Sequence, residues 1–316
     1  PYTTLFRSYM YEKWKGVHTR CAFNMIQELI PLTRPRTLAA ALGPTILGAA
    51  FSYYAFGAAQ GTGLAILHTV LIFLAVVTAQ IVANLWNEYK DFKSGLDAGQ
   101  KVGNAGSITR GVITPELIIT MIKVLMFVPI IIGLYLSATI TWYYIPVGFL
   151  CILISFLYSG GPKPISRTPF GEISSGIAMG FAIVLITGYA WIRELSLALL
   201  IPAIPSTLLV GSIMLTNNIR DIRNDESHGR HTLPIVLGRE RALSLMSISY
   251  IFNFIWIIAW IIVGHMTWFA LLAFLAAPLA FKTIHTLSTN TDEFQLDKAM
   301  GTTAGAAMIY QLMWAI

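Results

Sequence analysis

The chain has 316 residues, of which 56% are hydrophobic and only 11% are charged, and its mean hydropathy is +0.68. This composition excludes a soluble globular protein and indicates a chain that crosses a lipid bilayer several times. The net charge of +6 does not predict nucleic-acid binding. The basic residues fall in loops beside the predicted spans, where membrane topology and anionic lipid headgroups account for them.

The N-terminal part precedes the first apolar run. The chain opens on PYTTLFRS without an initiator Met, and we expect these first residues not to be native. Residues 1–36 are predicted to form a cytoplasmic segment, and residues 37–316 a single membrane domain. The two cysteines are Cys21 in the N-terminal segment and Cys151 within an apolar run, and they predict neither a disulfide framework nor a metal cluster.

Nine apolar runs predict an all-α integral membrane fold, because a bilayer-spanning helix requires about 20 mainly apolar residues. The predicted spans are residues 37–57, 64–85, 115–137, 141–158, 172–192, 196–216, 243–263, 266–285 and 298–316. The last run is short and rich in small residues, which let helices pack closely in lipid.

The loops between these spans are strongly asymmetric in charge. Nearly all of the 21 Lys and Arg residues fall in the N-terminal segment or in alternate loops on its side, whereas Arg193 alone falls in a loop on the other side. Positive loops stay in the cytoplasm, so the N-terminus is predicted to be cytoplasmic. The large cytoplasmic loops are then residues 86–114, 159–171 and 217–242, and the acidic loop 286–297 is interpreted as a solvated connection.

Two polar segments stand out because each directly follows an apolar run and begins with Asn. The first cassette is NEYKDFKSGLD (87–97), and the second, 130 positions later, is NNIRDIRND (217–225). In the second, Asn217, Asp221 and Asp225 are spaced i, i+4 and i+8, so on a helix they share one face. The first begins with the same spacing. Its third acid follows Gly95, which predicts that the helix stops there and a loop returns Asp97 to the site.

Acidic, amide-led segments of this kind predict a site for Mg²⁺ and a diphosphate. Aspartates would repel a diphosphate that met them directly, so divalent cations must lie between them. Mg²⁺ is usually held by one or two carboxylates, waters and phosphate oxygens, and we therefore expect two ions, one for each cassette. The alternative for either cassette alone is an ordinary solvated helix end. The pair, at two membrane boundaries on the cytoplasmic side, favours the metal site.

These motifs resemble the UbiA-type intramembrane prenyltransferases over nearly the whole chain. The resembling stretches are RPRTL (34–38), NEYKDFKSGLD (87–97), GNAGSITRG (103–111), YSGGPKPISRTPFGE (158–172) and NNIRDIRNDESHGRHTLPIVLG (217–238). They are most similar to the branch that acts on 1,4-dihydroxy-2-naphthoate, which shows the same six-residue step between the first-cassette acids. Glu88 departs from the family, where many members have Asp, but it lies off the predicted ligand face.

The resemblance implies a role for each matching position. The implied metal ligands are Asn87, Asp91, Asp97, Asn217, Asp221 and Asp225. The implied diphosphate contacts are Asn87, Lys163, Arg220, Arg34 and Arg110, and Asp91, Asp221, Lys163 and Arg220 are the implied catalytic residues. For each of these basic residues the alternative is a charge that only sets topology, and for Arg34 and Arg110 it is also a loop clamp.

The function implied by the resemblance is Mg²⁺-dependent transfer of a polyprenyl group from its diphosphate to 1,4-dihydroxy-2-naphthoate, with loss of CO₂ and pyrophosphate. The product would be demethylmenaquinone, made at the cell membrane. One alternative is a related transferase that acts on 4-hydroxybenzoate or homogentisate. A more distant alternative is an ion-coupled transporter, but a transporter should carry its key acids near the bilayer midplane rather than at one surface.

Overall fold

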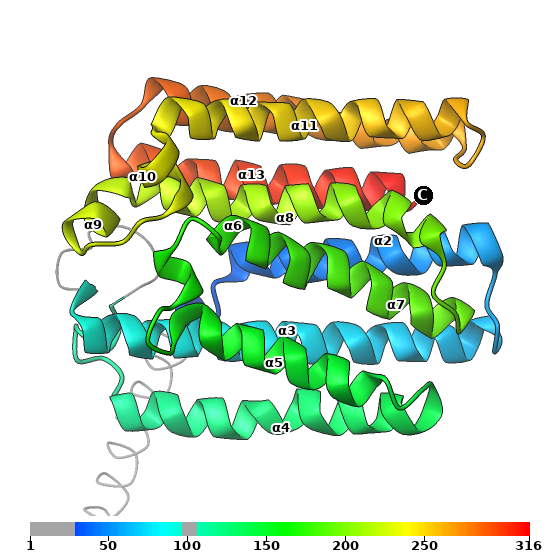
Figure 1. Cartoon of the computed structure of the whole chain (residues 1–316), viewed down its shortest axis with the longest axis horizontal. Coiled ribbons are helices and arrows are strands. Elements are labelled where there is room, and N and C mark those ends of the chain that lie inside the picture. Colours follow the sequence, from blue (N-terminus) through cyan, green and yellow to red (C-terminus); the bar gives the residue numbers. More distant parts are fainter. Residues whose placement is uncertain (1–28, 97–105) are drawn as a thin grey trace, which may run out of the picture.

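The computed structural model describes residues 29–96 and 106–316, and every regular element in these ranges is helical (Figure 1). The elements are η1 (Pro35–Leu38), α2 (Ala39–Phe56), α3 (Thr62–Ser94), α4 (Pro115–Thr139), α5 (Tyr144–Ser159), η3 (Ile165–Arg167), α6 (Gly171–Ser175), η4 (Gly176–Phe181), α7 (Ala182–Ile192), η5 (Leu197–Leu199), α8 (Leu200–Arg220), α9 (Ile222–Ser227), α10 (Leu233–Leu237), α11 (Arg239–Ile262), η6 (Trp268–Ala276), α12 (Ala277–Thr289) and α13 (Glu293–Trp314). The all-α prediction is confirmed for this part of the chain.

Each of the nine predicted spans coincides with a helix or with consecutive helical segments. Seven of these, in the described ranges, are long and apolar enough to cross a membrane. Of the other two, α5 has only 16 residues, and α13 has 22 but begins with charged residues and is less apolar. The chain is therefore a multi-pass membrane protein with seven candidate spans, and the count of nine remains a prediction.

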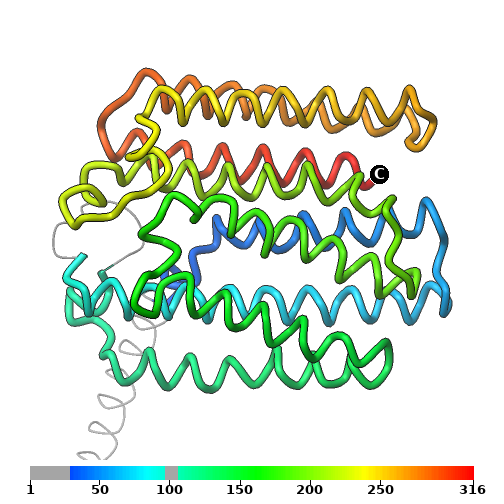
Figure 2. The backbone as a smooth tube through the Cα atoms, viewed as in Figure 1, coloured from blue at the N-terminus to red at the C-terminus, as the bar shows by residue number. Residues whose placement is uncertain are grey.

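The long helices lie side by side along one direction (Figures 1 and 2). Outer helices present large apolar side chains to the surroundings, for example Phe127 and Ile131 on α4, which are 62% and 63% exposed. Such exposure suits lipid contact. The small residues of α13 pack it closely against α2 and α8. Inside the bundle the Ser206 hydroxyl donates to Gln311 Oε1 at 2.8 Å, linking α8 to α13.

The two ends of the bundle differ. Short turns join α2 to α3 and α11 to η6 at one end, whereas the segments that contain α9, α10, η3 and α6 lie at the other (Figure 1). The C-terminal end of α3, the C-terminal end of α8 and the N-terminal end of α13 all reach this second end. Both cassettes therefore lie at the same end of the molecule.

Candidate active site

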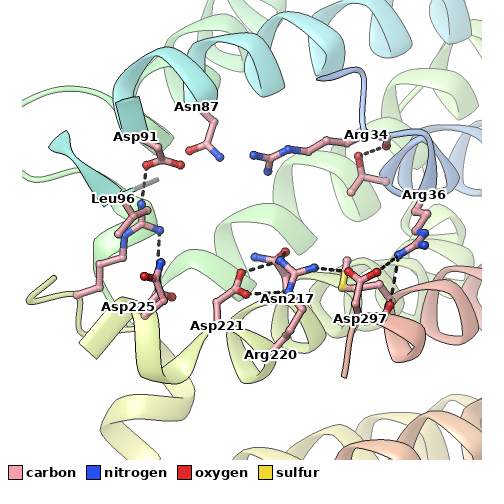
Figure 3. A pocket seen from close by; sticks show the side chains of 14 residues that line it. Arg34, Arg36, Asn87, Asp91, Leu96, Asn217, Arg220, Asp221, Asp225 and Asp297 are labelled. Carbon is pink, nitrogen blue, oxygen red and sulfur yellow. Dashed lines mark hydrogen bonds and ion pairs between the residues drawn. The ribbon is translucent and has the colours of Figure 1, made fainter. Parts of the chain in front are cut away.

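A pocket opens between these helix ends (Figure 3), and it contains four arginines and four aspartates among its described lining residues. The lining residues are Arg34, Arg36, Thr37, Asn87, Asp91, Leu96, Asn217, Arg220, Asp221, Asn224, Asp225, Arg230, Asp297 and Met300. Segments far apart in the sequence thus supply a concentrated set of oxygen ligands and cations.

The first wall is the last part of α3, which runs on past its apolar stretch. Asn87 and Asp91 lie one helical turn apart on the pocket side. Gly95 ends the helix with φ 74°, a left-handed conformation that glycine adopts without steric cost, so the predicted helix stop is confirmed. Asp97, predicted to return to the site, lies outside the described residues.

Arg34 reaches this wall from the segment before η1. A guanidinium only donates hydrogen bonds, so the amide oxygen of Asn87 faces it and accepts from both terminal nitrogens at 3.1 and 3.2 Å. The amide nitrogen then donates to Ser159 Oγ at 2.9 Å and to Asp91 Oδ2 at 3.3 Å. Arg34 has φ 50°, a costly backbone conformation for a residue with a side chain, and such strain is found preferentially at functional sites.

The second wall is formed by α8 and α9. The helix is interrupted at Asp221, but the i to i+4 backbone bonds continue, from Asp221 N to Asn217 O at 3.1 Å and from Asp225 N to Asp221 O at 2.9 Å. The three side chains therefore keep the predicted spacing, and all three line the pocket. Together with Asn87 and Asp91, they place two rows of oxygen ligands opposite one another (Figure 3).

Arg220 is held by carboxylates on both sides. Its Nε and Nη2 donate to the two oxygens of Asp221, each at 2.7 Å, and its Nη1 donates to Asp297 at 2.9 Å. The side chain is only 7% exposed. Such a bidentate, charge-assisted pair is among the stronger polar contacts in proteins, so Arg220 fixes the position of Asp221.

Arg230 bridges the two walls. Its Nη2 donates to Asp91 Oδ1 at 2.6 Å, and its Nη1 lies 3.4 Å from Asp225 Oδ1. One guanidinium therefore lies between the first cassette and the second.

Not every predicted residue reaches the pocket. Lys163 and Arg110 are exposed and do not line it, and the Arg110 guanidinium donates instead to Ser107 Oγ at 3.2 Å. Lys163 and Arg110 lie in loops. The path of a loop depends on how it packs against the rest of the protein, and a sequence motif does not specify that packing.

Three charged residues of the pocket were missed from the sequence. The loop 286–297 was interpreted as a solvated connection, but Asp297 lies on α13 and accepts from both Arg220 and Arg36. From the sequence, Arg36 and Arg230 are only two of the basic residues that indicate the cytoplasmic side. The position of Asp297 in the sequence could have indicated its role. Asp297 lies at the edge of an apolar run, directly before the last one, and the two cassettes also lie at the edges of apolar runs.

Two buried glutamates support the walls. Glu88 is 1% exposed and accepts from Ser107 N at 2.7 Å, which attaches the segment after the first cassette to α3. It does not line the pocket, in agreement with its expected place off the ligand face. Glu172 is 6% exposed and accepts from Asn218 Nδ2 at 2.8 Å, which links α6 to α8 beside Asn217.

The carboxylate and amide oxygens of the pocket fit an Mg²⁺ ion that is held by few protein ligands. Within the described ranges no three acidic, histidine or cysteine side chains converge into a closed cage. Mg²⁺ that also binds a substrate phosphate requires only one or two carboxylates and keeps several waters. Asp91 on one wall and Asp221 with Asp225 on the other meet that requirement, and the cation already between Asp91 and Asp225 shows that this place accommodates positive charge.

If Asp225 binds a metal, its raised pKa would make that binding dependent on pH. Burial raises the pKa of Asp225 from 3.8 to about 7, the Arg230 guanidinium opposes the rise, and the carboxylates of Asp221 and Asp91 reinforce it. Below this pKa the metal must displace a proton. We expect Mn²⁺ affinity, measured by electron paramagnetic resonance on detergent-solubilised protein, to fall about tenfold for each pH unit below 7 and to level off above 8.

The control is Asp225→Asn, which should bind Mn²⁺ more weakly and without this dependence. The same raised pKa favours the folded, metal-free protein at low pH, and this contribution is lost as the pH rises through about 7. A wild-type affinity that is flat between pH 5.5 and 8, a range of about 2.5 units around that pKa, would contradict the assignment.

Residues 41–310 match the UbiA prenyltransferase family, and the chain belongs to that family. It is an aromatic prenyltransferase of the membrane-embedded kind. The chain is 34% identical over 297 residues to the 1,4-dihydroxy-2-naphthoate octaprenyltransferase of Bacillus subtilis, with 93% of this chain and 92% of the relative covered. It is 26% identical to the enzyme of the same name from Escherichia coli, with 94% and 97% covered.

Solved structures agree with the fold. A UbiA homolog from Aeropyrum pernix superimposes with a TM-score of 0.66 at 18% identity, covering 87% of this chain and 96% of the homolog. A UbiA homolog from Archaeoglobus fulgidus, bound to GPP and Mg²⁺, superimposes with a TM-score of 0.60 at 15% identity, covering 92% and 100%. The expected UbiA-like bundle is confirmed.

Proposed function

We propose that this enzyme transfers a polyprenyl group from its diphosphate to 1,4-dihydroxy-2-naphthoate, with loss of CO₂ and pyrophosphate, and yields demethylmenaquinone in its reduced form. The observation that carries the proposal is the meeting of Asn87 and Asp91 with Asn217, Asp221 and Asp225 around one arginine-rich pocket. The relatives named for this reaction supply the acceptor.

The chain binds the donor through its two ligand rows. Asn87 and Asp91, with Asp97, would hold one Mg²⁺, and Asn217, Asp221 and Asp225 the other. Bound Mg²⁺ supplies neutralising charge to the departing pyrophosphate. Among the predicted basic contacts, Arg34 and Arg220 line the pocket and are assigned to the diphosphate end of the donor, whereas Lys163 and Arg110 do not line it.

The acceptor chemistry requires no strong protein base. As the bond from C1 of the prenyl group to oxygen breaks, C1 becomes cation-like, and the ring carbon that carries the carboxylate forms the new carbon–carbon bond. The neighbouring hydroxyl releases its proton in this step. Loss of CO₂ returns an electron pair to the ring, restores aromaticity and allows the oxygen to recover a proton. The pocket contributes charge stabilisation of the leaving group.

The test uses purified protein, Mg²⁺ and a polyprenyl diphosphate with either carboxyl-labelled 1,4-dihydroxy-2-naphthoate or carboxyl-labelled 4-hydroxybenzoate. We expect released label to match prenylated product with the naphthoate, and little product with the benzoate. Efficient prenylation of the benzoate with its label retained would overturn the naphthoate assignment and favour the alternative aromatic acceptor. The transporter alternative is not supported, because the chain belongs to a prenyltransferase family.

The enzyme is proposed to lie in the cell membrane with its N-terminus and pocket in the cytoplasm. The basic loops gather at the pocket end, whereas Arg193 lies at the other end, between α7 and η5. In a background without Cys21 and Cys151, a membrane-impermeant maleimide added to intact cells should label His265→Cys, between α11 and η6, and spare Thr291→Cys, between α12 and α13. The opposite labelling pattern would reverse the orientation.

A further inference from the structure

The Arg230 side chain forms ion pairs with both cassettes. Its partners, Asp91 and Asp225, are assigned to different metal half-sites, and the two ion pairs appear as dashed lines beside these residues in Figure 3. The Arg230 side chain is 11% exposed, and those of Asp91 and Asp225 are 10% and 4% exposed. A metal that binds either carboxylate must compete with this guanidinium.

The described lining of the pocket is balanced in charge. Each aspartate in the described lining is paired with an arginine: Asp91 and Asp225 with Arg230, Asp221 with Arg220, and Asp297 with Arg220 and Arg36. The two principal arginines differ in one respect. Arg220 keeps Asp297, which belongs to neither cassette, whereas both carboxylate partners of Arg230 are predicted metal ligands.

Arg230 also retains a free donor. Its Nε is buried and has no hydrogen-bond partner among the described residues. The carboxylates use only the two outer nitrogens of the planar group. Since a guanidinium matches phosphate oxygens with several parallel donors, an anion that entered the pocket beside Arg230 would meet an unused N–H.

The Arg230 backbone is attached to the second cassette independently of the side chain. Its N–H donates to Asp225 O at 2.9 Å, Gly229 turns the chain with φ 67°, and His231 N donates to Arg167 O at 3.0 Å. The long, rotatable side chain therefore separates a fixed backbone anchor from the guanidinium. The group can change partners without a change in the fold.

We propose that Arg230 is an exchangeable counter-ion, which neutralises Asp91 and Asp225 in the empty enzyme and moves to the diphosphate when Mg²⁺ takes those carboxylates. This inference rests on the proposed metal site. Mg²⁺ beside an arginine that stayed in place would be repelled, but a diphosphate between them attracts both cations and outweighs this repulsion. Metal and diphosphate should therefore bind cooperatively, each poorly alone and well together.

The test compares wild type with Arg230→Gln by Mn²⁺ binding without and with pyrophosphate, and by pyrophosphate binding at saturating Mg²⁺. At a pH well above 7, where the Asp225 carboxyl is ionised, we expect Mn²⁺ alone to bind the variant about tenfold more tightly, because its competitor is gone, and pyrophosphate to bind at least about tenfold more weakly. The factor by which pyrophosphate improves Mn²⁺ binding should fall toward one. A purely structural role would instead weaken Mn²⁺ and pyrophosphate binding together.

Two further variants keep the test decisive. Arg241→Gln removes the same charge from an exposed position at the start of α11 and should leave both affinities unchanged. Arg230→Lys retains the charge but not the fork, so Mn²⁺ alone should bind as in wild type while pyrophosphate binds with intermediate affinity. Weaker binding of Mn²⁺ alone in Arg230→Gln would overturn this inference only. Wild-type protein that binds no metal even with pyrophosphate would overturn the proposed function itself.

Discussion

Asp91→Asn and Asp221→Asn should each reduce turnover by about two decades or more, which corresponds to the loss of about 3 kcal/mol of electrostatic stabilisation. An amide has nearly the shape of the carboxylate but lacks the charge that holds Mg²⁺ against a diphosphate. The two residues lie on opposite walls of the pocket, so similar losses at both positions would indicate that both ligand rows are required. EDTA should abolish turnover of the wild-type enzyme as well.

The matched control is Glu226→Gln on α9, which removes an exposed carboxylate from the same polar segment and should leave turnover unchanged. The measurement is prenylated product formed per enzyme at saturating donor and acceptor, repeated at limiting Mg²⁺. Near-normal activity of Asp221→Asn at limiting Mg²⁺ would contradict the role of the second cassette in metal binding.

Arg220→Gln should lower both activity and stability. The substitution leaves Asp221 and Asp297 without their shared cation in a largely buried place, and removal of one partner from a buried ion pair costs about 3–5 kcal/mol. Turnover should fall by about two to three decades, because Asp221 also loses the bidentate contact that fixes its position and the diphosphate loses a cation. Thermal unfolding in detergent and product formation measure the two effects separately.

Arg36→Gln is the control for this prediction. Arg36 shares Asp297 with Arg220, but its side chain is 52% exposed, and an exposed ion pair contributes about 1 kcal/mol or less. The double variant Arg220→Gln with Asp297→Asn should recover part of the lost stability, because it removes the unpaired charge. If the Arg220→Gln protein were as stable and as active as Arg36→Gln, the buried ion pairs of Arg220 with Asp221 and Asp297 would not be needed for stability or activity.

The helices and the ligand rows could be predicted from local pattern. Apolar length predicted a helix for every run, the spacing of Asn217, Asp221 and Asp225 predicted a common face, and Gly95 predicted the end of α3. These features depend on neighbouring residues and on the geometry of one helix, so they can be read without knowledge of packing.

The partners of the charged groups depended on packing instead. Arg230 pairs with Asp91 across 139 positions, and Arg220 pairs with Asp297 across 77, because α3, α8 and α13 bring their ends together. Sequence reasoning placed Arg34, Arg220, Lys163 and Arg110 at this site. Arg34 and Arg220 line the pocket, and Lys163 and Arg110 do not. The fold adds Arg36, Arg230 and Asp297, which the local pattern did not predict. Electrostatic pairing falls off with distance in space and is indifferent to separation along the chain, so the identity of the counter-ions belongs to the tertiary structure.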